Sequence, residues 1–328
     1  MSTHVPQVRG RFAPSPTGAI HLGNVWTALL AWLDARQRGG AFVLRMEDLD
    51  PDRSRPQFAT QLLDDLRWLG LDWDEGPDVG GPYAPYVQDQ RRADYAAALD
   101  RLIAQELVYA CYCSRAEVRA VASAPHGPAQ RERCPNECWR LSAAQRQARE
   151  AAGRRPSLRV RMPEQPTPIH FDDLCVGPVD EDIAQTAGDF VVRRADGVHA
   201  YQLAVVVDDG AMAISHVIRG VDLLDSTARQ VWLHRLLGFT PPRFGHVPLL
   251  IDGEGHRLSK RHASLAIAEL RAAGHHPAEI IGWLAHWAGF IPAPEPVQPR
   301  ALIGALDLAR LPRESIVVGD QGSGVRDR

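Results

Sequence analysis

The first third of the chain contains a strand, helix and strand pattern that strongly limits the possible fold. The segments VRGRF (8–12) and AFVLRMED (41–48) are short and apolar, and each predicts a buried strand. Between them, VWTALLAWLDARQR (25–38) has the apolar spacing of a helix, which Gly39 ends. A crossover helix between two strands is typical of a parallel pair. We therefore expect an α/β protein with a doubly wound, Rossmann-type parallel sheet.

Downstream patterns extend this sheet domain and interrupt it. The dipeptide Asp196-Gly197 predicts a hairpin within the β-rich run 189–209. Strands are expected at 215–220 and 244–252, and helices at 55–70, 91–107, 226–237, 263–273, 277–288 and 300–310. Residues 108–188 differ in composition, with cysteines, prolines and arginine-rich pieces. We expect 1–107 and 189–252 to form the two halves of the sheet domain, 108–188 an insertion, and 253–328 a loop and helical region with a disordered tail.

Bulk composition excludes some classes of function. The apolar runs are too short to cross a bilayer, and the first residues, MSTHVPQVRGRF, lack the apolar core of a signal peptide. We expect a cytoplasmic protein, a monomer without a membrane partner. The net charge of −3 does not by itself indicate a nucleic acid ligand, although a local arginine-rich face could still bind one.

One basic residue stands out by its chemistry. Lys260, in GHRLSKRH (255–262), is the only lysine among 37 lysine and arginine residues. An ammonium is a compact point charge, whereas a guanidinium is a broad planar fork, so the two differ around phosphate oxygens. Lys260 is therefore either a chance survivor of an arginine-biased composition or a residue that contacts phosphate.

The loop before the first long helix has a second candidate for phosphate binding. The sequence HLGN (21–24) lies at the helix entry, where unpaired N–H groups and the helix dipole favour anions. His21 could donate to a phosphate oxygen, and Gly23 would allow a flat ring to approach the backbone. Taken alone, the same residues fit an N-cap at Asn24 beside a solvated histidine.

Four of the five cysteines are clustered, as C-x-C at 111–113 and C-x-x-x-C at 134–138. Two close pairs of thiolates suit tetrahedral Zn²⁺. We therefore predict a zinc site formed by Cys111, Cys113, Cys134 and Cys138; the alternative is a group of reduced thiols. Cys175 lies apart from them and is expected to be an ordinary packed or exposed thiol.

Three sequence blocks together resemble the class I aminoacyl-tRNA synthetases, in their glutamyl branch. These are RFAPSPTGAIHLGN (11–24), RMEDLDPDR (45–53) and RLSKR (257–261). The segment HLGN stands where that class has its HIGH signature, with Asn24 in place of the last histidine, and RLSKR stands where it has KMSKS. The resemblance covers roughly residues 8–262.

The resemblance implies a role for each matching residue. His21 and Lys260 would be catalytic, because they would stabilise the charge that develops as glutamate attacks the α-phosphate of ATP. ATP would be bound by His21, Gly23, Asn24 and Lys260 and would enter with Mg²⁺. Glutamate would be bound by Arg11, Phe12, Ala13, Pro14, Ser15, Glu47, Tyr201 and Arg219. In isolation, a surface arginine would be the favoured interpretation of Arg219, and an ordinary strand aromatic that of Tyr201.

The chain also resembles one branch of this class, the glutamyl-Q tRNA(Asp) synthetases, in its cysteine pattern and in the short stretch after Lys260. That resemblance implies ligase activity: formation of glutamyl-adenylate without tRNA, then transfer of glutamate to the queuosine base of tRNA(Asp). It also implies one structural zinc per chain. Two alternatives remain open. These are a short glutamyl-tRNA synthetase that charges a tRNA 3′ end, and a non-catalytic module that binds glutamate and ATP.

Overall fold

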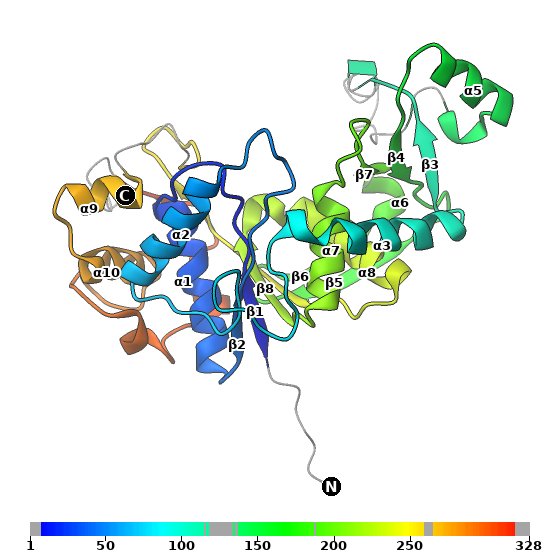
Figure 1. The fold of residues 1–328 in the computed structure, drawn as a ribbon. Helices are drawn as coiled ribbons and strands as arrows, with labels where there is room; N and C mark the ends of the chain where they lie inside the picture. Colours follow the sequence, from blue (N-terminus) through cyan, green and yellow to red (C-terminus); the bar gives the residue numbers. More distant parts are fainter. Residues whose placement is uncertain are drawn as a thin grey trace, which may run out of the picture.

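A parallel sheet forms the centre of the molecule in this computed structural model (Figure 1). The structure describes residues 8–114, 116–117, 134, 137–186, 188–258 and 265–318. Within these ranges the central sheet has four strands in the order β2-β1-β8-β9, all parallel. Their bounds are β1 Arg9–Phe12, β2 Ala41–Leu44, β8 His216–Gly220 and β9 Arg243–Val247. The α/β parallel fold predicted from the first strand, helix and strand is confirmed.

Helices cover both faces of this sheet because alternate strand residues point to opposite sides. Phe42 and Leu44 enter a core with the helices α1 (Leu22–Gln37), α2 (Pro56–Trp68) and α10 (Pro277–Trp287). Val43 and Val217 point into a second core, which contains α3 (Arg92–Ala104), α7 (Tyr201–Ala211) and α8 (Thr227–Leu237). Two cores on opposite faces hold the strand ends in fixed positions. None of the helices described is long and apolar enough to span a membrane.

Two small antiparallel sheets involve the insertion, and one of them also includes a strand that follows it. Strands β3 (Val108–Cys111), β4 (Ser157–Val160) and β7 (Phe190–Arg193) form one, and the hairpin β5 (Pro168–Asp173) and β6 (Gly177–Asp182) forms the other. The first sheet projects from the body and carries α5 (Ala143–Ala151) at its outer end (Figure 1). Smaller elements here are η2 (Cys138–Arg140) and α6 (Ile183–Thr186).

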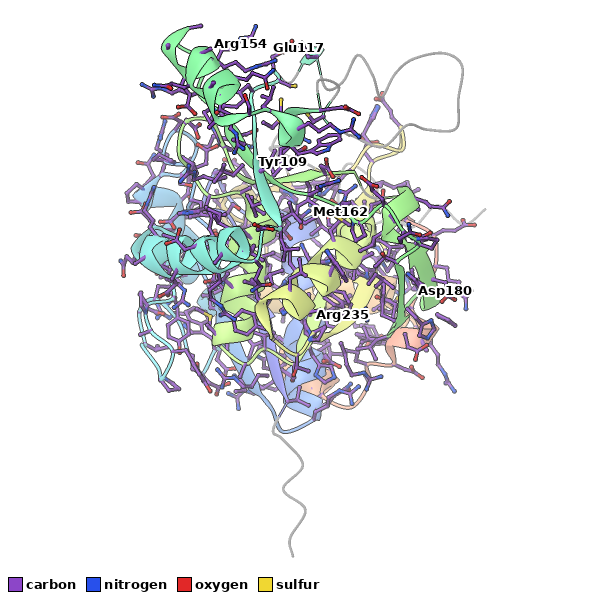
Figure 2. The ribbon with its side chains drawn as sticks, turned by 90° about the vertical axis from the view of Figure 1, so that its right-hand side faces the viewer. Tyr109, Glu117, Arg154, Met162, Asp180 and Arg235 are labelled. Carbon is purple, nitrogen blue, oxygen red and sulfur yellow. The ribbon has the colours of Figure 1, made fainter. Side chains whose placement is uncertain are left out.

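Asp189 links β3 to the segment after β4 at the base of this projecting sheet. Its carboxylate accepts a hydrogen bond from the Tyr109 hydroxyl at 2.8 Å and from the Met162 N–H at 2.8 Å. Figure 2 labels Tyr109 and Met162, with Glu117 and Arg154 further out at the end of the projection. The β7 strand that Asp189 precedes belongs to the expected second half of the sheet domain, yet it pairs with β4 of the expected insertion. The domain boundaries themselves stay a prediction.

The β-rich run 189–209 is a strand and a helix rather than two strands. The predicted Asp196-Gly197 turn is present, and the N–H of Arg194 donates to the carbonyl of Val198 at 2.8 Å. After one further bridge between Arg193 and His199, however, the chain enters α7. The valine-rich α7 is buried between α3 and α8, and this tertiary burial outweighs the strand preference of β-branched residues.

The C-terminal region shares its core with the sheet domain. Helices α9 (Ile267–Ala272) and α10 pack with α1, and β11 (Ile316–Val317) pairs in parallel with β10 (Leu250–Ile251). The prediction of a helix at 300–310 is wrong, because only the 3₁₀ turns η5 (Pro299–Leu302) and η6 (Leu308–Arg310) form there. Gly304 between them has a φ of +93°, which ends any helix. The tail predicted to be disordered, 319–328, lies outside the described residues.

Candidate active site

A cavity of about 470 Å³ opens where the parallel strands end. Strand β1 connects through α1 to β2 on one side, and β8 connects through α8 to β9 on the other. The strand order therefore reverses between β1 and β8, which is where α/β sheets bind ligands. Every residue that the resemblance assigned to glutamate or ATP lines this cavity, except Lys260: Arg11, Phe12, Ala13, Pro14, Ser15, His21, Gly23, Asn24, Glu47, Tyr201 and Arg219.

His21 begins α1 rather than lying in a free loop. It is the N-cap residue, and its backbone N–H donates to the Asn24 Oδ1 at 3.1 Å. The simple alternative of an Asn24 N-cap is therefore wrong, because the helix starts three residues earlier than the apolar spacing indicated. A Cβ built on Gly23 would lie 3.1 Å from two ring atoms of His21. The glycine thus leaves room for the imidazole at the wall of the cavity.

The segment that contains Lys260 lies outside the described residues, which stop at Leu258 and resume at Leu265. One flank of that gap lies near Gly23 and the other beside His21. Leu258 lines the cavity and lies 3.8 Å from a Cβ built on Gly23. Ala266 forms an antiparallel bridge with His21 itself. The HLGN segment (21–24) therefore lies close to the described residues on either side of the gap that contains Lys260.

Glu47 and Arg11 line the cavity, and two buried charged residues, Arg45 and Asp209, lie behind them. Arg45 is fully buried and contacts Glu47 at 3.0 Å and Asp209 at 2.8 Å, and Arg11 lies 3.4 Å from Asp209. Burial alone would raise the pKa of Asp209, but Arg11 and Arg45 outweigh it and lower this pKa to about 2. Burial raises the pKa of Glu47, and its two arginines offset this only in part. The N–H of Glu47 donates to the Pro14 carbonyl at 2.9 Å, which fixes this acid beside the first block.

Arg219 is the second buried cation in the cavity, and its partners are neutral. Its guanidinium donates to His246 Nε2 at 3.0 Å, to Gln230 Oε1 at 2.7 Å and to the Thr227 hydroxyl at 2.8 Å. It also donates to the Leu223 carbonyl at 3.4 Å, and burial lowers its pKa. Within the described residues no carboxylate forms an ion pair with it, so its charge remains available to an anion in the cavity.

Tyr201 completes this end of the cavity from the first residue of α7. Its ring is partly exposed, and it is a helix residue rather than the strand aromatic considered above. Arg11, Arg219 and Glu47 thus face one space, and their charges match the two carboxylates and one ammonium of glutamate. Two further charged residues of the lining, Arg257 and Asp222, form an ion pair with each other. Sequence reasoning missed Arg45 and Asp209, although charged residues beside apolar runs (VLRMED, AVVVDDG) could have indicated buried ion pairs.

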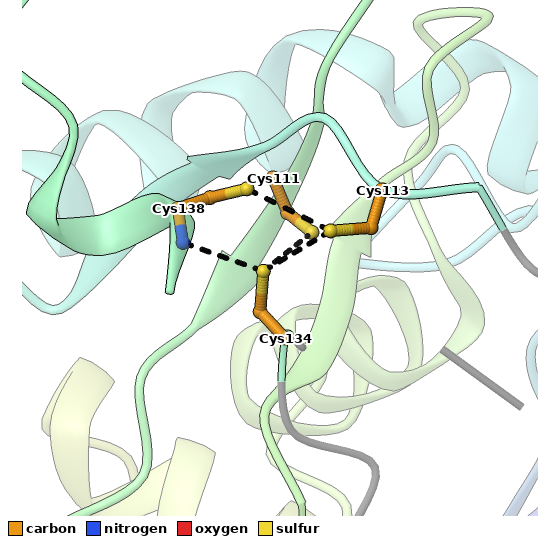
Figure 3. A group of neighbouring side chains, drawn as sticks. All are labelled: Cys111, Cys113, Cys134 and Cys138. Carbon is orange, nitrogen blue, oxygen red and sulfur yellow. Dashed lines mark hydrogen bonds between the residues drawn. The ribbon is translucent and has the colours of Figure 1, made fainter. Parts of the chain in front are cut away.

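The four clustered cysteines converge at the outer end of β3 (Figure 3). Their Sγ atoms all lie within 4.8 Å of one another, with Sγ–Sγ distances of 3.5 Å for Cys111–Cys134 and 3.3 Å for Cys113–Cys134. Sulfur atoms about 2.3 Å from a tetrahedral ion would be separated by about 3.8 Å, so the group fits Zn²⁺ after a small expansion. None of the cysteines forms a disulfide, and Cys175 is packed in the main core.

Comparisons with known proteins agree with this geometry. The family described as "tRNA synthetases class I (E and Q), catalytic domain" matches residues 7–293. A glutamyl-Q tRNA(Asp) synthetase of Symbiobacterium thermophilum is 56% identical over 94% of this chain and 94% of its own length. The chain belongs to the glutamyl-Q tRNA(Asp) synthetase family of class I. It is therefore a ligase of the aminoacyl-tRNA synthetase type.

Other members and structures place this glutamyl-Q tRNA(Asp) synthetase family member near the glutamate enzymes. A glutamyl-Q tRNA(Asp) synthetase of Nitratidesulfovibrio vulgaris is 53% identical over 94% of this chain and 95% of its own length. The crystal structure of a glutamate-tRNA synthetase from Elizabethkingia anophelis superposes with a TM-score of 0.83 and 29% identity, over 96% of this chain and 69% of that one. The crystal structure of a glutamate tRNA ligase from Elizabethkingia meningosepticum, in complex with its amino acid, superposes with a TM-score of 0.81 and 30% identity. The match covers 95% of this chain and 67% of that one.

Proposed function

We propose that this ligase activates glutamate with ATP and transfers it to the queuosine base of tRNA(Asp). The observation that carries the first step is Arg219, a buried guanidinium with only neutral partners, in the same cavity as Glu47. Arg219 would bind one carboxylate of glutamate, and Glu47 would bind the ammonium. Arg11 would contribute less charge, because Asp209 already neutralises part of it.

Activation would proceed by an in-line displacement. A carboxylate oxygen of glutamate attacks the α-phosphorus of ATP, a new P–O bond forms, and the bond to pyrophosphate breaks. The attacking oxygen is already ionised, so no general base is required. His21 would donate to the phosphate oxygens from the N-terminus of α1, where the helix dipole also favours negative charge. Lys260, two residues after Leu258 in the chain, would add the compact cation.

Transfer would then use an acceptor hydroxyl on the tRNA. This hydroxyl attacks the carbonyl carbon of the adenylate, AMP leaves, and the hydroxyl proton is released. Queuosine as the acceptor is supported by the names of the relatives that match over nearly their whole length. The runner-up is charging of a tRNA 3′ end, which is favoured by a glutamate–tRNA ligase 2 of Nitrosococcus oceani, 42% identical over 93% of this chain.

The four clustered cysteines would hold one Zn²⁺ per chain, with ATP entering as its magnesium complex. A bound ion would link the end of β3 to the turn at Cys138. The local core that it would reinforce is small, since it consists of Tyr109, Tyr112 and the cysteines, with a few partly buried neighbours. The small local core therefore favours a structural role for the ion over a catalytic one.

Two assays test the proposal. Glutamate-dependent exchange of labelled pyrophosphate into ATP should occur without tRNA, and Lys260→Arg should lower its rate markedly while the fold is unchanged. Absence of exchange in the wild-type protein would leave a binding module. Labelled glutamate should then be transferred to tRNA(Asp) that carries queuosine, and not to tRNA(Asp) that lacks it. Transfer to tRNA(Glu) instead would support the 3′-end alternative.

A further inference from the structure

Asp173 and His246 form a buried pair directly behind Arg219, although neither residue lines the cavity. Asp173 ends the hairpin strand β5 of the insertion, and His246 lies on β9 of the central sheet. The Nδ1 of His246 is 2.6 Å from Asp173 Oδ2. The other carboxylate oxygen, Oδ1, accepts the backbone N–H groups of Cys175, Val176 and His246 at 2.9–3.0 Å. The aspartate is thus held in one orientation.

These contacts determine which nitrogen of His246 carries the proton. Asp173 stays ionised, because burial would raise its pKa but the hydrogen bonds from His246 and the backbone outweigh this and lower it. Its Oδ2 can therefore only accept, so the Nδ1 of His246 must donate. Burial lowers the pKa of His246, so the ring is neutral and its Nε2 is an acceptor. Arg219 Nε, 3.0 Å away, can donate to this atom only in that tautomer.

The acceptors around Arg219 orient its buried guanidinium without neutralising its charge. Arg219 has five N–H donors, and four hydrogen bonds go to His246, Gln230, Thr227 and Leu223. All four acceptors are neutral, so they orient the fork without neutralising it. An arginine with a direct carboxylate partner, such as Arg45, would offer a weaker field to an anionic substrate.

We propose that Asp173 and His246 are positioning residues that orient Arg219 for the substrate carboxylate. The inference rests on the proposed function, because it deepens the account of the same glutamate site. Its consequence is that a hairpin of the insertion contributes to substrate selection through two hydrogen bonds. No residue of the recognisable motifs makes this link.

Isosteric changes test the proposal without altering side-chain volume. In Asp173→Asn the amide would donate to Nδ1 and shift the ring proton to Nε2, where it would oppose Arg219 Nε. We expect the KM for glutamate in pyrophosphate exchange to rise at least tenfold. The KM for ATP and kcat should stay within about threefold of wild type. Glutamate binding measured by calorimetry should weaken in parallel.

A matched pair at His246 separates positioning from simple packing. His246→Gln places a carbonyl oxygen near the position of Nε2, where it can accept from Arg219 Nε. This variant should therefore bind glutamate more tightly than Asp173→Asn does. His246→Asn keeps a donor to Asp173 but leaves Arg219 Nε without its acceptor, and it should behave as Asp173→Asn does. His216 is a buried histidine at the other end of β8 from Arg219, so His216→Gln is the control. It should leave the KM values for glutamate and ATP unchanged.

Some outcomes overturn the inference. A glutamate KM within twofold of wild type in a folded Asp173→Asn protein would do so, as would an equal rise in the KM for ATP. If Asp173→Asn does not fold, equal glutamate affinities in the two His246 variants would overturn it instead. A wild-type protein that neither binds glutamate nor catalyses exchange would refute the proposed function itself, which is a different result.

Discussion

At the scale of single residues, buried charge is concentrated around the candidate site. Arg45, Asp209 and Arg219 are all buried, and each has several hydrogen-bond or ionic partners. Leaving one such group without its partner costs several kcal/mol, so the residues that line the cavity depend on those behind it. His234 differs, because its ring is buried on α8 and its Nδ1 has no hydrogen-bond partner among the described residues.

His234 should make the stability of the protein sensitive to acid. Burial lowers its pKa from 6.5 to about 4, so between these values the unfolded chain binds a proton that the folded one does not. The neutral His234 ring therefore leaves the free energy of unfolding unaffected above pH 6.5, and this free energy decreases as the pH falls from 6.5 toward 4. Between pH 7 and pH 5 the loss should be about 2 kcal/mol.

Urea denaturation at the two pH values measures this effect. His234→Gln should remove about 2 kcal/mol of the wild-type difference, because glutamine does not titrate. Comparing the two proteins cancels the titration of every other group, including the cysteines. Equal pH dependence in wild type and variant would show that the buried imidazole does not titrate as its environment indicates.

At the scale of elements, the N-terminus of α1 combines a helix cap with the candidate phosphate site. Gly23 is the second residue of this helix, and glycine within a helix is less favourable than alanine, by about 0.5–1 kcal/mol at interior positions. The glycine is retained at a position where a Cβ would come within 3.1 Å of the His21 ring. Local helix stability and the position of the imidazole therefore impose opposite preferences here.

Gly23→Ala should separate these two effects. We expect unchanged or slightly increased thermal stability, together with a roughly tenfold lower kcat for pyrophosphate exchange, because the His21 ring must move by a few tenths of an ångström. Gly253→Ala is the control, since a Cβ built there meets nothing within 4 Å. Full activity in Gly23→Ala would mean that the imidazole position does not limit the reaction.

At the scale of the whole molecule, the insertion and the sheet domain depend on different interactions. The sheet domain has two extensive apolar cores, whereas the projecting sheet has only the small cluster around Tyr109 and the cysteines. The β5–β6 hairpin nevertheless packs on β9 and supplies Asp173 behind the cavity. Loss of order in the projection should therefore leave the central sheet folded.

Zinc content tests this division. We expect about one zinc per chain by metal analysis, with loss of the ion in Cys134→Ser and its retention in Cys175→Ser. In Cys134→Ser, protease cleavage should appear within residues 108–188, while the remaining sheet domain unfolds at nearly the wild-type temperature. Zinc bound equally by both variants, or absent from the freshly purified wild type, would contradict the cysteine site.

The strand, helix and strand order and the clustering of the cysteine pairs could be predicted from sequence, because each depends on local periodicity or spacing. The resemblance to the class I synthetases, rather than spacing, indicated the residues that line the cavity. The Arg219 support could not, since Asp173 and His246 are 73 residues apart and belong to no motif. The same holds for α7, whose valines favour a strand until α3 and α8 bury them as a helix. Local patterns determine most of the elements of the central sheet domain. The helical state of α7, and the orientation and charge of a buried side chain, depend on neighbours that only the folded chain brings together.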